Sequence, residues 1–388
     1  NGDHQGSGRV GGDGVMAKLG EVCKVSASTK MIDKSKAWLL NLDMVEQQTG
    51  RVVEYNFVGE DGLNGSITQF DTENVLYSKL RPNLNKVVLP ERDGFCTSEL
   101  LPLRPDARKL DRSYLAVFLR SDGFVNWAVS KTAGAKMPRL GTKDLLNANI
   151  PLPEIKEQKA IAEKFKKLEQ LISLRKQQLA KLDELAKARF VEMFGDISNS
   201  RKVSMQDVCK IITDGTHQPP KFVLSGIPFL FVSNIVTNEI HYDAEKFISE
   251  ETYNELIKRT PIEVGDVLLS TVGSYGHPAV VKENKPFCFQ RHIAYLKPNN
   301  SVVNSEYLRC AILSTDLQRQ IDESVKGIAQ KTLNLSEIRK LRLPLPSLSL
   351  QNQFAAFVER IDQQKQTVQQ SLEKLELMKK ALMQEYFG

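Results

Sequence analysis

Residues 151–195 read PLPEIKEQKAIAEKFKKLEQLISLRKQQLAKLDELAKARFVEMFG. The same pattern returns 193 positions later, at residues 344–388, as PLPSLSLQNQFAAFVERIDQQKQTVQQSLEKLELMKKALMQEYFG. After the opening Pro-x-Pro, neither copy contains Gly or Pro until its closing Phe-Gly. This pattern predicts two long helices, 154–195 and 347–388, each ended by a glycine. At 1.5 Å per residue, each helix is about 60 Å long.

Both predicted helices carry an apolar seam whose positions are spaced alternately by four and three residues, which is typical of coiled coils. One such helix could simply cover its own domain, but two matching seams favour antiparallel packing of the helices on each other. Four seam residues are basic, and they either set the register of the helices or extend to solvent; we favour the second. These basic residues are Arg175, Arg189, Lys365 and Lys379.

The repeat extends in front of the helices. KLGEVCKV at residues 18–25 is similar to SMQDVCKI at 204–211, and NVLYS at 74–78 is similar to DVLLS at 266–270. Short β-rich runs, such as 228–233 and 266–270, alternate with Asp-Gly turn signals. The sequence therefore predicts two α+β domains, each with a mixed, twisted sheet plus helices, related by a pseudo-twofold axis. Their expected extents are 16–153 and 196–346.

Composition narrows the class of protein. Residues 1–15 contain six glycines, and we expect them to be a leader left from cloning, with Met16 as the native start. The net charge of +6 is compatible with a nucleic-acid partner. Five scattered cysteines without a CxxC pair argue against disulfides and zinc, and we expect reduced thiols in a cytoplasmic protein. No apolar run approaches the roughly 20 residues that span a bilayer.

Motifs of enzymes are missing from the sequence. It contains no G-x-x-x-x-G-K-[ST] loop and no G-x-G-x-x-G after a strand. QPPKF at residues 218–222 departs from the Asn/Asp-Pro-Pro-aromatic segment of adenine methyltransferases. The histidines His217, His277 and His292 lack the spacing of metal ligands. We therefore expect no catalytic residue, no bound cofactor and no metal site in this chain.

Two segments of the second half carry a specific resemblance. They are DGTHQPP at residues 214–220 and GIAQKTLNLSEIRKLRLPLP at residues 327–346, the latter running into the second helix. Together with the duplicated plan of domain and helix, they resemble the specificity subunits of type I restriction-modification systems. The first half matches less closely, because GAKMPRL at residues 134–140 stands in place of the Gly-x-x-Gln segment.

The resemblance implies a division of labour. Each domain would be a target recognition domain that reads one half of a split, asymmetric site in double-stranded DNA, and the helices would fix the spacer. The helices would also dock modification subunits, expected to be two, which bring S-adenosylmethionine. Restriction subunits would bring ATP and Mg²⁺ for translocation and cleavage, so that the chain itself is non-catalytic. The alternative is a coiled-coil protein–protein adaptor without sequence-specific DNA binding.

Candidate DNA contacts are loops that offer basic side chains together with amides or hydroxyls. Lys and Arg bind phosphates, and Arg, Asn, Gln, Ser and Thr read base edges. The recurrence of basic residues beside Gly134 and Gly327 favours those two loops. The candidates in the first domain are Ser78, Lys79, Arg81, Lys86, Lys131, Lys136 and Arg139. The candidates in the second domain are Thr216, His217, Lys221, Ser274, Tyr275, His277, Gln290, Arg291, Lys326, Gln330 and Lys331.

Overall fold

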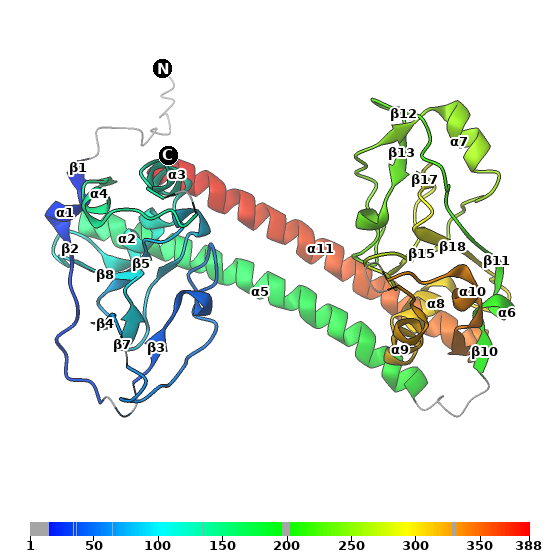
Figure 1. Ribbon diagram of the computed structural model, residues 1–388, viewed down its shortest axis with the longest axis horizontal. Coiled ribbons are helices and arrows are strands. Elements are labelled where there is room, and N and C mark those ends of the chain that lie inside the picture. Colours follow the sequence, from blue (N-terminus) through cyan, green and yellow to red (C-terminus); the bar gives the residue numbers. More distant parts are fainter. Residues whose placement is uncertain are drawn as a thin grey trace, which may run out of the picture. The chain divides into compact units, whose positions relative to one another are not determined.

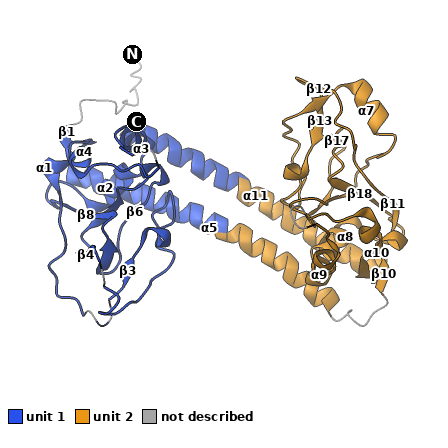
Figure 2. Ribbon diagram, in the orientation of Figure 1, with its two compact units in different colours: residues 1–176, 370–388 blue, residues 177–369 orange. Residues whose placement is uncertain are grey.

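A computed structural model of the chain describes residues 15–33, 35, 37–63, 65–134, 136–195, 202–327 and 331–388. Figure 1 shows the order of its helices and strands. The chain forms two compact units, which Figure 2 distinguishes by colour. Unit 1 comprises residues 1–176 and 370–388, and unit 2 comprises residues 177–369. Of the expected leader, only Val15 is among the described residues.

Unit 1 contains two main sheets. The larger has the strand order β2-β8-β5-β6, all antiparallel, and the smaller has the order β3-β7-β4 with β3 parallel to β7. Strand β1 pairs with β9. The elements of unit 1 in front of the long helices are β1 (Met16–Lys18), α1 (Leu19–Val22), β2 (Cys23–Val25), β3 (Leu39–Leu40), η2 (Leu42–Met44), β4 (Ile67–Phe70), β5 (Val75–Ser78), η3 (Pro82–Leu84), β6 (Val87–Val88), β7 (Gly94–Thr97), β8 (Leu100–Pro105), α2 (Arg112–Leu119), α3 (Asp122–Ser130), α4 (Thr142–Leu146) and β9 (Asn149–Pro151).

Unit 2 repeats this plan with the strand orders β11-β18-β15-β16, β12-β14-β13-β17 and β10-β19. The strand expected over 228–233 is shorter, because β13 ends at Leu230 and the Asn234 side chain accepts the Phe231 N–H at 2.9 Å to cap a 3-10 turn. The elements of unit 2 are β10 (Lys202–Ser204), α6 (Met205–Val208), β11 (Cys209–Asp214), β12 (Phe222–Val223), β13 (Ile227–Leu230), η5 (Val232–Asn234), β14 (Phe247–Ile248), α7 (Glu250–Leu256), β15 (Val267–Ser270), β16 (Pro278–Val280), β17 (Cys288–Phe289), β18 (Ile293–Pro298), α8 (Ser305–Ile312), α9 (Thr315–Ser324), α10 (Leu335–Lys340) and β19 (Arg342–Pro344).

The inner strand β5 serves two hydrophobic cores. Successive side chains of a strand point to opposite faces of the sheet. Val75 and Tyr77 lie in the core that contains Phe118 and Phe165, whereas Leu76 lies in a separate core. The three apolar residues of β15 divide in the same way, with Val267 and Leu269 in one core of unit 2 and Leu268 in another. The run of consecutive apolar residues is therefore explained by a strand that is covered on both faces.

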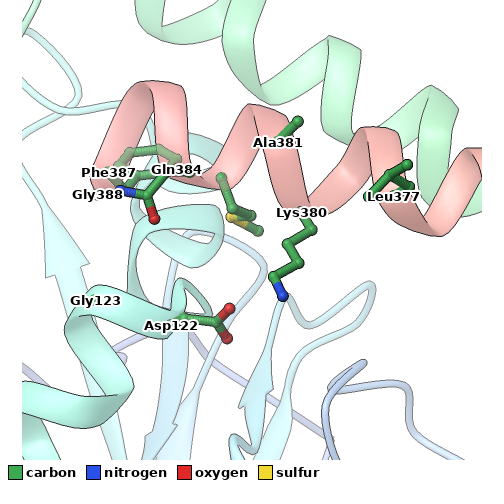
Figure 3. A pocket seen from close by; sticks show the side chains of 9 residues that line it. Asp122, Gly123, Leu377, Lys380, Ala381, Gln384, Phe387 and Gly388 are labelled. Carbon is green, nitrogen blue, oxygen red and sulfur yellow. The ribbon is translucent and has the colours of Figure 1, made fainter.

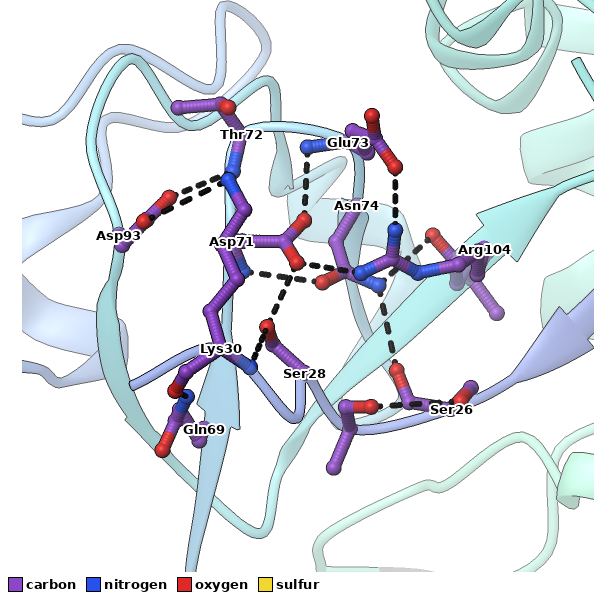
Figure 4. A network of polar contacts seen from close by, with 12 residues as sticks. Ser26, Ser28, Lys30, Gln69, Asp71, Thr72, Glu73, Asn74, Asp93 and Arg104 are labelled. Atoms are coloured by element: carbon purple, nitrogen blue, oxygen red, sulfur yellow. Dashed lines mark hydrogen bonds and ion pairs between the residues drawn. The ribbon is translucent and has the colours of Figure 1, made fainter. Parts of the chain in front are cut away.

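A buried polar network ties the strands of unit 1 together (Figure 4). The Asp71 carboxylate is only 2% exposed; it accepts hydrogen bonds from the Ser28 hydroxyl at 2.6 Å and the Glu73 N–H at 2.9 Å, and it pairs with Arg104. The Asp71 N–H donates to the Asn74 side chain at 3.0 Å. Burial by itself raises the pKa of Asp71, but the hydrogen bonds to the carboxylate outweigh burial and lower this pKa overall.

Unit 2 builds an equivalent network from different residues. The Glu263 N–H donates to the Asp266 carboxylate at 2.8 Å, as the Asp71 N–H does to its partner in unit 1. Lys297 takes the place of the arginine, with its ammonium 2.7 Å from Glu263 and 3.3 Å from Asp266. The Tyr295 hydroxyl adds a hydrogen bond of 2.8 Å to Asp266. The two halves therefore share polar geometry that their residue identities do not show.

The predicted long helices are α5 (Ile155–Phe194) and α11 (Leu348–Phe387), each one residue shorter at either end than expected. Within unit 1, contacts at Lys164–Tyr386 and Glu169–Lys379 show that the helices run antiparallel. Within unit 2, the Asp183–Lys365 ion pair and the contact between the Phe190 and Phe354 rings show the same direction. All twenty positions of the predicted seam are buried or half-buried, so the helices pack through it. These positions are Ile161, Phe165, Leu168, Ile172, Arg175, Leu179, Leu182, Ala186, Arg189 and Met193 in α5, and Phe354, Val358, Ile361, Lys365, Val368, Leu372, Leu375, Lys379, Leu382 and Tyr386 in α11.

The basic residues of the seam mostly contact the other helix. Lys379 lies 2.9 Å from Glu169, Lys365 lies 2.9 Å from Asp183, and Arg175 donates to Ser371 at 3.2 Å. Arg189 pairs with Glu192 on its own helix, and its guanidinium lies 5.8 Å from the centre of the Phe357 ring on α11. The favoured prediction of basic ends extending to solvent is therefore wrong for three of these four residues. Carboxylates and a hydroxyl beside the seam are close enough to hold the charged ends.

A buried glutamine attaches each long helix to its domain. The Gln158 side chain accepts the Asp111 N–H at 2.8 Å and donates to the carbonyls of Lys109 and Pro153 at 2.9 and 2.8 Å. Gln351 repeats these three bonds in unit 2 with other partners. Both side chains are fully buried. Because a buried polar group is costly unless it is hydrogen-bonded, these bonds fix the start of each helix against its domain.

The closing aromatic of each repeat packs into a core. Phe387 at the end of α11 contacts the rings of Tyr114, Phe118 and Phe165 in unit 1. Phe194 at the end of α5 packs in the same manner on Tyr307 and other rings of unit 2. Phe387 thus completes the core of unit 1 from the far end of the chain. Phe194, at the end of the first repeat, completes the core of unit 2.

Candidate functional site

Loops gather at one end of the main sheet in each unit. In unit 1 the last residue of β5 pairs with the first residue of β8, at Ser78 and Leu100. In unit 2 the corresponding pair is Ser270 and Ile293. Residues that follow β5 or β15 therefore lie beside residues that precede β8 or β18. We call these the sheet-end loops: residues 79–81, 98–99, 133–134 and 136–140 in unit 1, and 214–217, 271–277, 290–292, 326–327 and 331–333 in unit 2.

Four backbone hydrogen bonds form a frame within the sheet-end loops of unit 1. The Lys79 N–H donates to the Glu99 carbonyl at 3.1 Å, and the Leu140 N–H donates to the Lys79 carbonyl at 2.9 Å. Ala133 and Arg139 exchange two further bonds, of 3.1 and 3.0 Å. This exchange closes a loop that begins with Gly134, whose φ of +99° suits a residue without a Cβ.

Unit 2 has the same frame with different side chains. The Thr271 N–H donates to the His292 carbonyl at 2.9 Å, and the Leu333 N–H donates to the Thr271 carbonyl at 2.8 Å. The backbones of Lys326 and Thr332 exchange two further bonds, of 3.0 and 2.8 Å. Gly327 repeats the positive φ, at +106°. The matched positions thus carry Thr271, His292 and Thr332 in unit 2, where unit 1 has a lysine, a glutamate and an arginine. One backbone arrangement presents two different chemical surfaces.

Most of the predicted contact residues of unit 1 lie at this frame. Lys79 is half-buried, and the other side chains at the sheet end are exposed; they are Arg81, Lys131, Lys136 and Arg139. Two candidates point elsewhere. The Ser78 side chain is 4% exposed and its hydroxyl donates to the Leu80 carbonyl at 2.9 Å. Lys86 donates to the Leu42 carbonyl at 2.5 Å, and burial lowers its pKa. These two side chains serve the interior of the unit, and we leave them out of the candidate interface.

The predicted loops of unit 2 also come together. The Arg291 N–H donates to the Thr216 carbonyl at 3.0 Å, and the Gly273 N–H donates to the Lys331 carbonyl at 3.3 Å. Between these loops lies a crevice of about 410 Å³ whose lining includes Arg291 and His292. The exposed candidates there are His217, Ser274, Arg291, Lys326 and Lys331, with Thr216 and Gln290 half-buried beside them.

The remaining candidates of unit 2 differ in position. Lys221 is exposed and lies just before β12. The Tyr275 hydroxyl donates to Asp322 at 3.0 Å, and the His277 ring lies 3.3 Å from the Asn238 side chain. Gln330 lies outside the described residues. The contacts of all these residues with DNA stay predictions.

Charged groups missed by sequence reasoning complete both surfaces. In unit 1, Glu99 forms a two-point ion pair with Arg139. In unit 2, Arg259 reaches Asp214 at 2.5 Å, and His217 lies 3.0 Å from the same carboxylate. Glu99 could have been predicted from the repeat, because it directly precedes β8 just as His292 directly precedes β18. Arg259 had no such signal, because it lies 45 positions from its partner in the sequence, with three strands and helix α7 between them.

The ionisable groups of the crevice favour recognition by hydrogen bonds. Burial and the nearby Arg291 lower the pKa of His292 below its usual value. The His292 ring is therefore neutral at pH 7; its Nε2 accepts a hydrogen bond of 3.4 Å from Arg291 Nε, which leaves the N–H of Nδ1 as a donor. Arg291 remains a cation next to it. A neutral ring beside a cation is suited to contacts with base edges and phosphates.

A second hollow, of about 320 Å³, lies in unit 1 between the start of α3 and the end of α11 (Figure 3). Asp122 and Lys380 are its charged side chains, and Leu377 and Phe387 are apolar parts of its lining. None of the predicted contact residues lines it. The described residues contain no group of three His, Cys, Asp or Glu side chains arranged to hold a metal ion.

The cysteines are free thiols, and all five lie among the described residues. Four are buried, and burial raises the pKa of Cys23, Cys96, Cys209 and Cys288 to about 12. These thiols are therefore protonated at neutral pH and are poor nucleophiles. Within the described part of the chain, no helix combines the length and apolar character that a membrane crossing needs.

Comparison with known proteins shows where this architecture recurs. Residues 13–184 and 198–377 each match the family described as "Type I restriction modification DNA specificity domain". The Escherichia coli type I restriction enzyme EcoBI specificity subunit is 23% identical over 269 residues, which cover 62% of this chain and 56% of that subunit. The chain thus spans little more than half the length of that relative.

Two further relatives are similar over a larger share of their length. The MjaVIII specificity subunit of Methanocaldococcus jannaschii is 21% identical over 323 residues, 78% of this chain and 75% of that subunit. The crystal structure of the type I restriction-modification system S subunit from M. genitalium is 15% identical. It matches 97% of this chain and 96% of its own, with a TM-score of 0.61, which shows a shared fold.

Proposed function

Because the chain belongs to the family of type I restriction-modification DNA specificity domains, with two copies of the domain, we propose that it is the DNA-reading subunit of such a system. Each unit reads one half of a split, asymmetric site in double-stranded DNA. The paired helices α5 and α11 set the spacer between the halves and dock the modification subunits. Restriction subunits join the same complex.

One observation carries this proposal: both units hold the same four-bond frame, yet they present different side chains on it. A protein that reads two different half-sites needs one scaffold with two chemical surfaces. Exposed lysines and arginines beside each frame supply phosphate contacts, which position a protein on DNA without reading its sequence. Side chains at the frame then meet base edges.

The proposed subunit performs no chemistry itself. In this proposal, S-adenosylmethionine is bound by the modification subunits, and ATP and Mg²⁺ are bound by the restriction subunits. The sheet-end loops bring together amides, hydroxyls, cations and the neutral imidazole of His292. These groups recognise DNA, and the target adenine is methylated by the partner.

The test is to assemble the full chain with the modification subunits encoded beside it and to map methylation across a random-sequence DNA library. The expected result is one split motif that is methylated only when this chain is present. Methylation by the chain alone would falsify the non-catalytic role. A complex that assembles on the helices but methylates or binds DNA without sequence preference would instead support a protein–protein adaptor.

A further inference from the structure

At the centre of the unit 1 frame, Arg139 and Glu99 form an ion pair with two contacts. Arg139 Nε lies 3.3 Å from Glu99 Oε2, and Arg139 Nη2 lies 3.0 Å from Glu99 Oε1. The side chains are 45% and 26% exposed. The backbones of both residues belong to the frame, since Arg139 bonds to Ala133 and Glu99 accepts the Lys79 N–H. The pair is therefore held at a fixed place on the surface.

This geometry leaves the outer edge of the guanidinium available. Glu99 occupies Nε–H and one N–H of Nη2, while Nη1 and the second N–H of Nη2 have no partner among the residues that the structure describes. In the major groove, guanine presents its O6 and N7 acceptors side by side, and arginine bonds to both in the commonest specific contact with DNA. A carboxylate that already orients the arginine reduces the entropy lost when this contact forms.

The surroundings of the pair match a DNA surface. Four further basic residues belong to the sheet-end loops or their border: Lys79, Arg81, Lys131 and Lys136. Arg81 is linked to the loop of the pair, because its N–H donates to the Pro138 carbonyl at 2.8 Å. Cations around a central base-reading group would bind the phosphates on either side. Because Arg139 neutralises Glu99, the carboxylate does not repel the phosphates.

Unit 2 carries no such pair at the two matched frame positions. Thr332 and His292 occupy the matched frame positions, and neither carries a guanidinium or a carboxylate. An ion pair of the same two-contact geometry does occur elsewhere in unit 1, where Arg51 Nε and Nη2 lie 3.3 and 3.0 Å from Glu46. That pair belongs to a turn outside the frame. A substitution in it therefore shows whether loss of such an ion pair alters DNA recognition wherever it lies, or only within the frame.

We infer that Arg139, oriented by Glu99, selects a guanine–cytosine base pair in the half-site that unit 1 reads. The inference rests on the proposed function and adds to it the base and the residue that recognises it. A good two-point contact discriminates against the wrong base by roughly 5- to 140-fold. Unit 2 recognises its half-site without an arginine at the matched position.

The test uses the full chain with its modification subunits and a random-sequence library in which every methylated site is sequenced. Replacing residues 16–153 by those of a relative identifies the half-site of unit 1. R139A is expected to lower the preference for guanine at one position of that half by roughly 5- to 140-fold and to leave the other half unchanged. R139Q is expected to shift the preference towards adenine, whose N6 and N7 match a glutamine amide. E99A is expected to cause a smaller loss at the same position.

R51A is the matched control, and both half-sites are expected to stay as in the unaltered chain. If R139A does not assemble, R139K keeps the charge but loses the two-point fork, and it is expected to retain only part of the guanine preference. A unit 1 half-site without a guanine–cytosine pair, or an active R139A or R139K complex with undiminished guanine preference, overturns the inference alone. If the unaltered chain directs no split motif, the proposed function fails and the inference falls with it.

Discussion

At the scale of single residues, Asp71, Ser78 and Lys86 show which contacts cannot be predicted from the sequence. A matching repeat signals that Asp71 and Glu263 are comparable, but their networks use different cations and could be recognised only in three dimensions. Ser78 and Lys86 have the chemistry of DNA contacts, yet both side chains bond to carbonyls inside unit 1. Residue type and spacing indicated loops that lie together at one end of each main sheet. The Lys86 side chain is directed by a carbonyl 44 positions away, and the Ser78 hydroxyl by the Leu80 carbonyl two positions on, and neither contact has a signal in the sequence.

For Asp71, we expect D71N to lower the free energy of unfolding of unit 1 by about 1–3 kcal/mol at pH 7, because a buried, paired carboxylate loses its charge. The pKa of Asp71 is lower in the folded chain, so its contribution is fully present above the pKa of the unfolded chain, about 4. It is lost as the pH falls through the folded value. Denaturant unfolding of both proteins between pH 7 and pH 3 should show the difference shrinking on acidification.

The control for D71N is E46Q, which removes the charge from the exposed pair with Arg51. Surface pairs contribute roughly 0–1 kcal/mol, so little change is expected. An equal loss in both variants, or a D71N difference that persists undiminished at pH 3, would show that the buried network does not act through this charge.

For the exposed Lys136, we expect K136A to weaken binding of the assembled complex to all DNA sequences alike. A lysine that contacts one phosphate contributes about 0.9 to the slope of log K against log salt concentration. Titrations at several salt concentrations measure that slope. K109A is a suitable control, because Lys109 is exposed beyond the other end of β8. A slope unaltered by K136A but reduced by K109A would place the DNA elsewhere on the unit.

At the scale of elements, α5 and α11 were the most predictable parts of the molecule. Their lack of Gly and Pro, their seam and their closing Phe-Gly all depend on local sequence, so that their bounds agree with the prediction to one residue. The strands were harder to delimit, since β13 ends early where the Asn234 side chain bonds to three backbone groups. Such a turn is determined by side-chain bonding rather than by apolar periodicity.

The helix seam leads to a prediction about the spacer. Insertion of one heptad in α5 after Leu182 and of one in α11 next to Lys365, which faces Asp183, preserves the seam and lengthens both helices by about 10 Å. We expect the methylated motif to keep both halves and to gain about three base pairs of spacer, at 3.4 Å per base pair. Mapping of methylated sites measures this directly.

Insertion of four residues at the same two places is the matched control for the heptads. It shifts the seam out of register, and we expect reduced thermal stability and no defined motif. A heptad variant that alters the bases of either half, or that leaves the spacer unchanged, would show that the helices do not set the spacer length.

For the whole molecule, the division into units does not follow the order of the chain. Unit 1 takes residues 370–388 from the far end of the sequence, and Phe387 is buried among its aromatic rings. The repeat was visible in the sequence, and so was the antiparallel pairing that permits this exchange. The rings that contact Phe387 could not be predicted, because no pattern in residues 114–165 signals a site for a distant ring.

The exchange predicts an asymmetric effect of one substitution. F387A removes a 9%-exposed ring, and we expect it to destabilise unit 1 by about 3–5 kcal/mol while unit 2 keeps its stability. Hydrogen exchange, followed separately for amides of β5 and β15, distinguishes the two units. F194A is the mirror control and should affect β15 rather than β5. Equal loss of protection in both strands after either substitution would mean that the units unfold as one.

The burial of Phe387 in unit 1 also bears on how the protein is made. A ribosome delivers residues in order, and domains commonly fold as they emerge. The strands of unit 1 are synthesised first, but their core lacks its last ring until residue 387 has been added. Unit 2 draws only on residues 177–369 and can close earlier. The portion of the protein that is translated first is therefore the portion that reaches its final packing last.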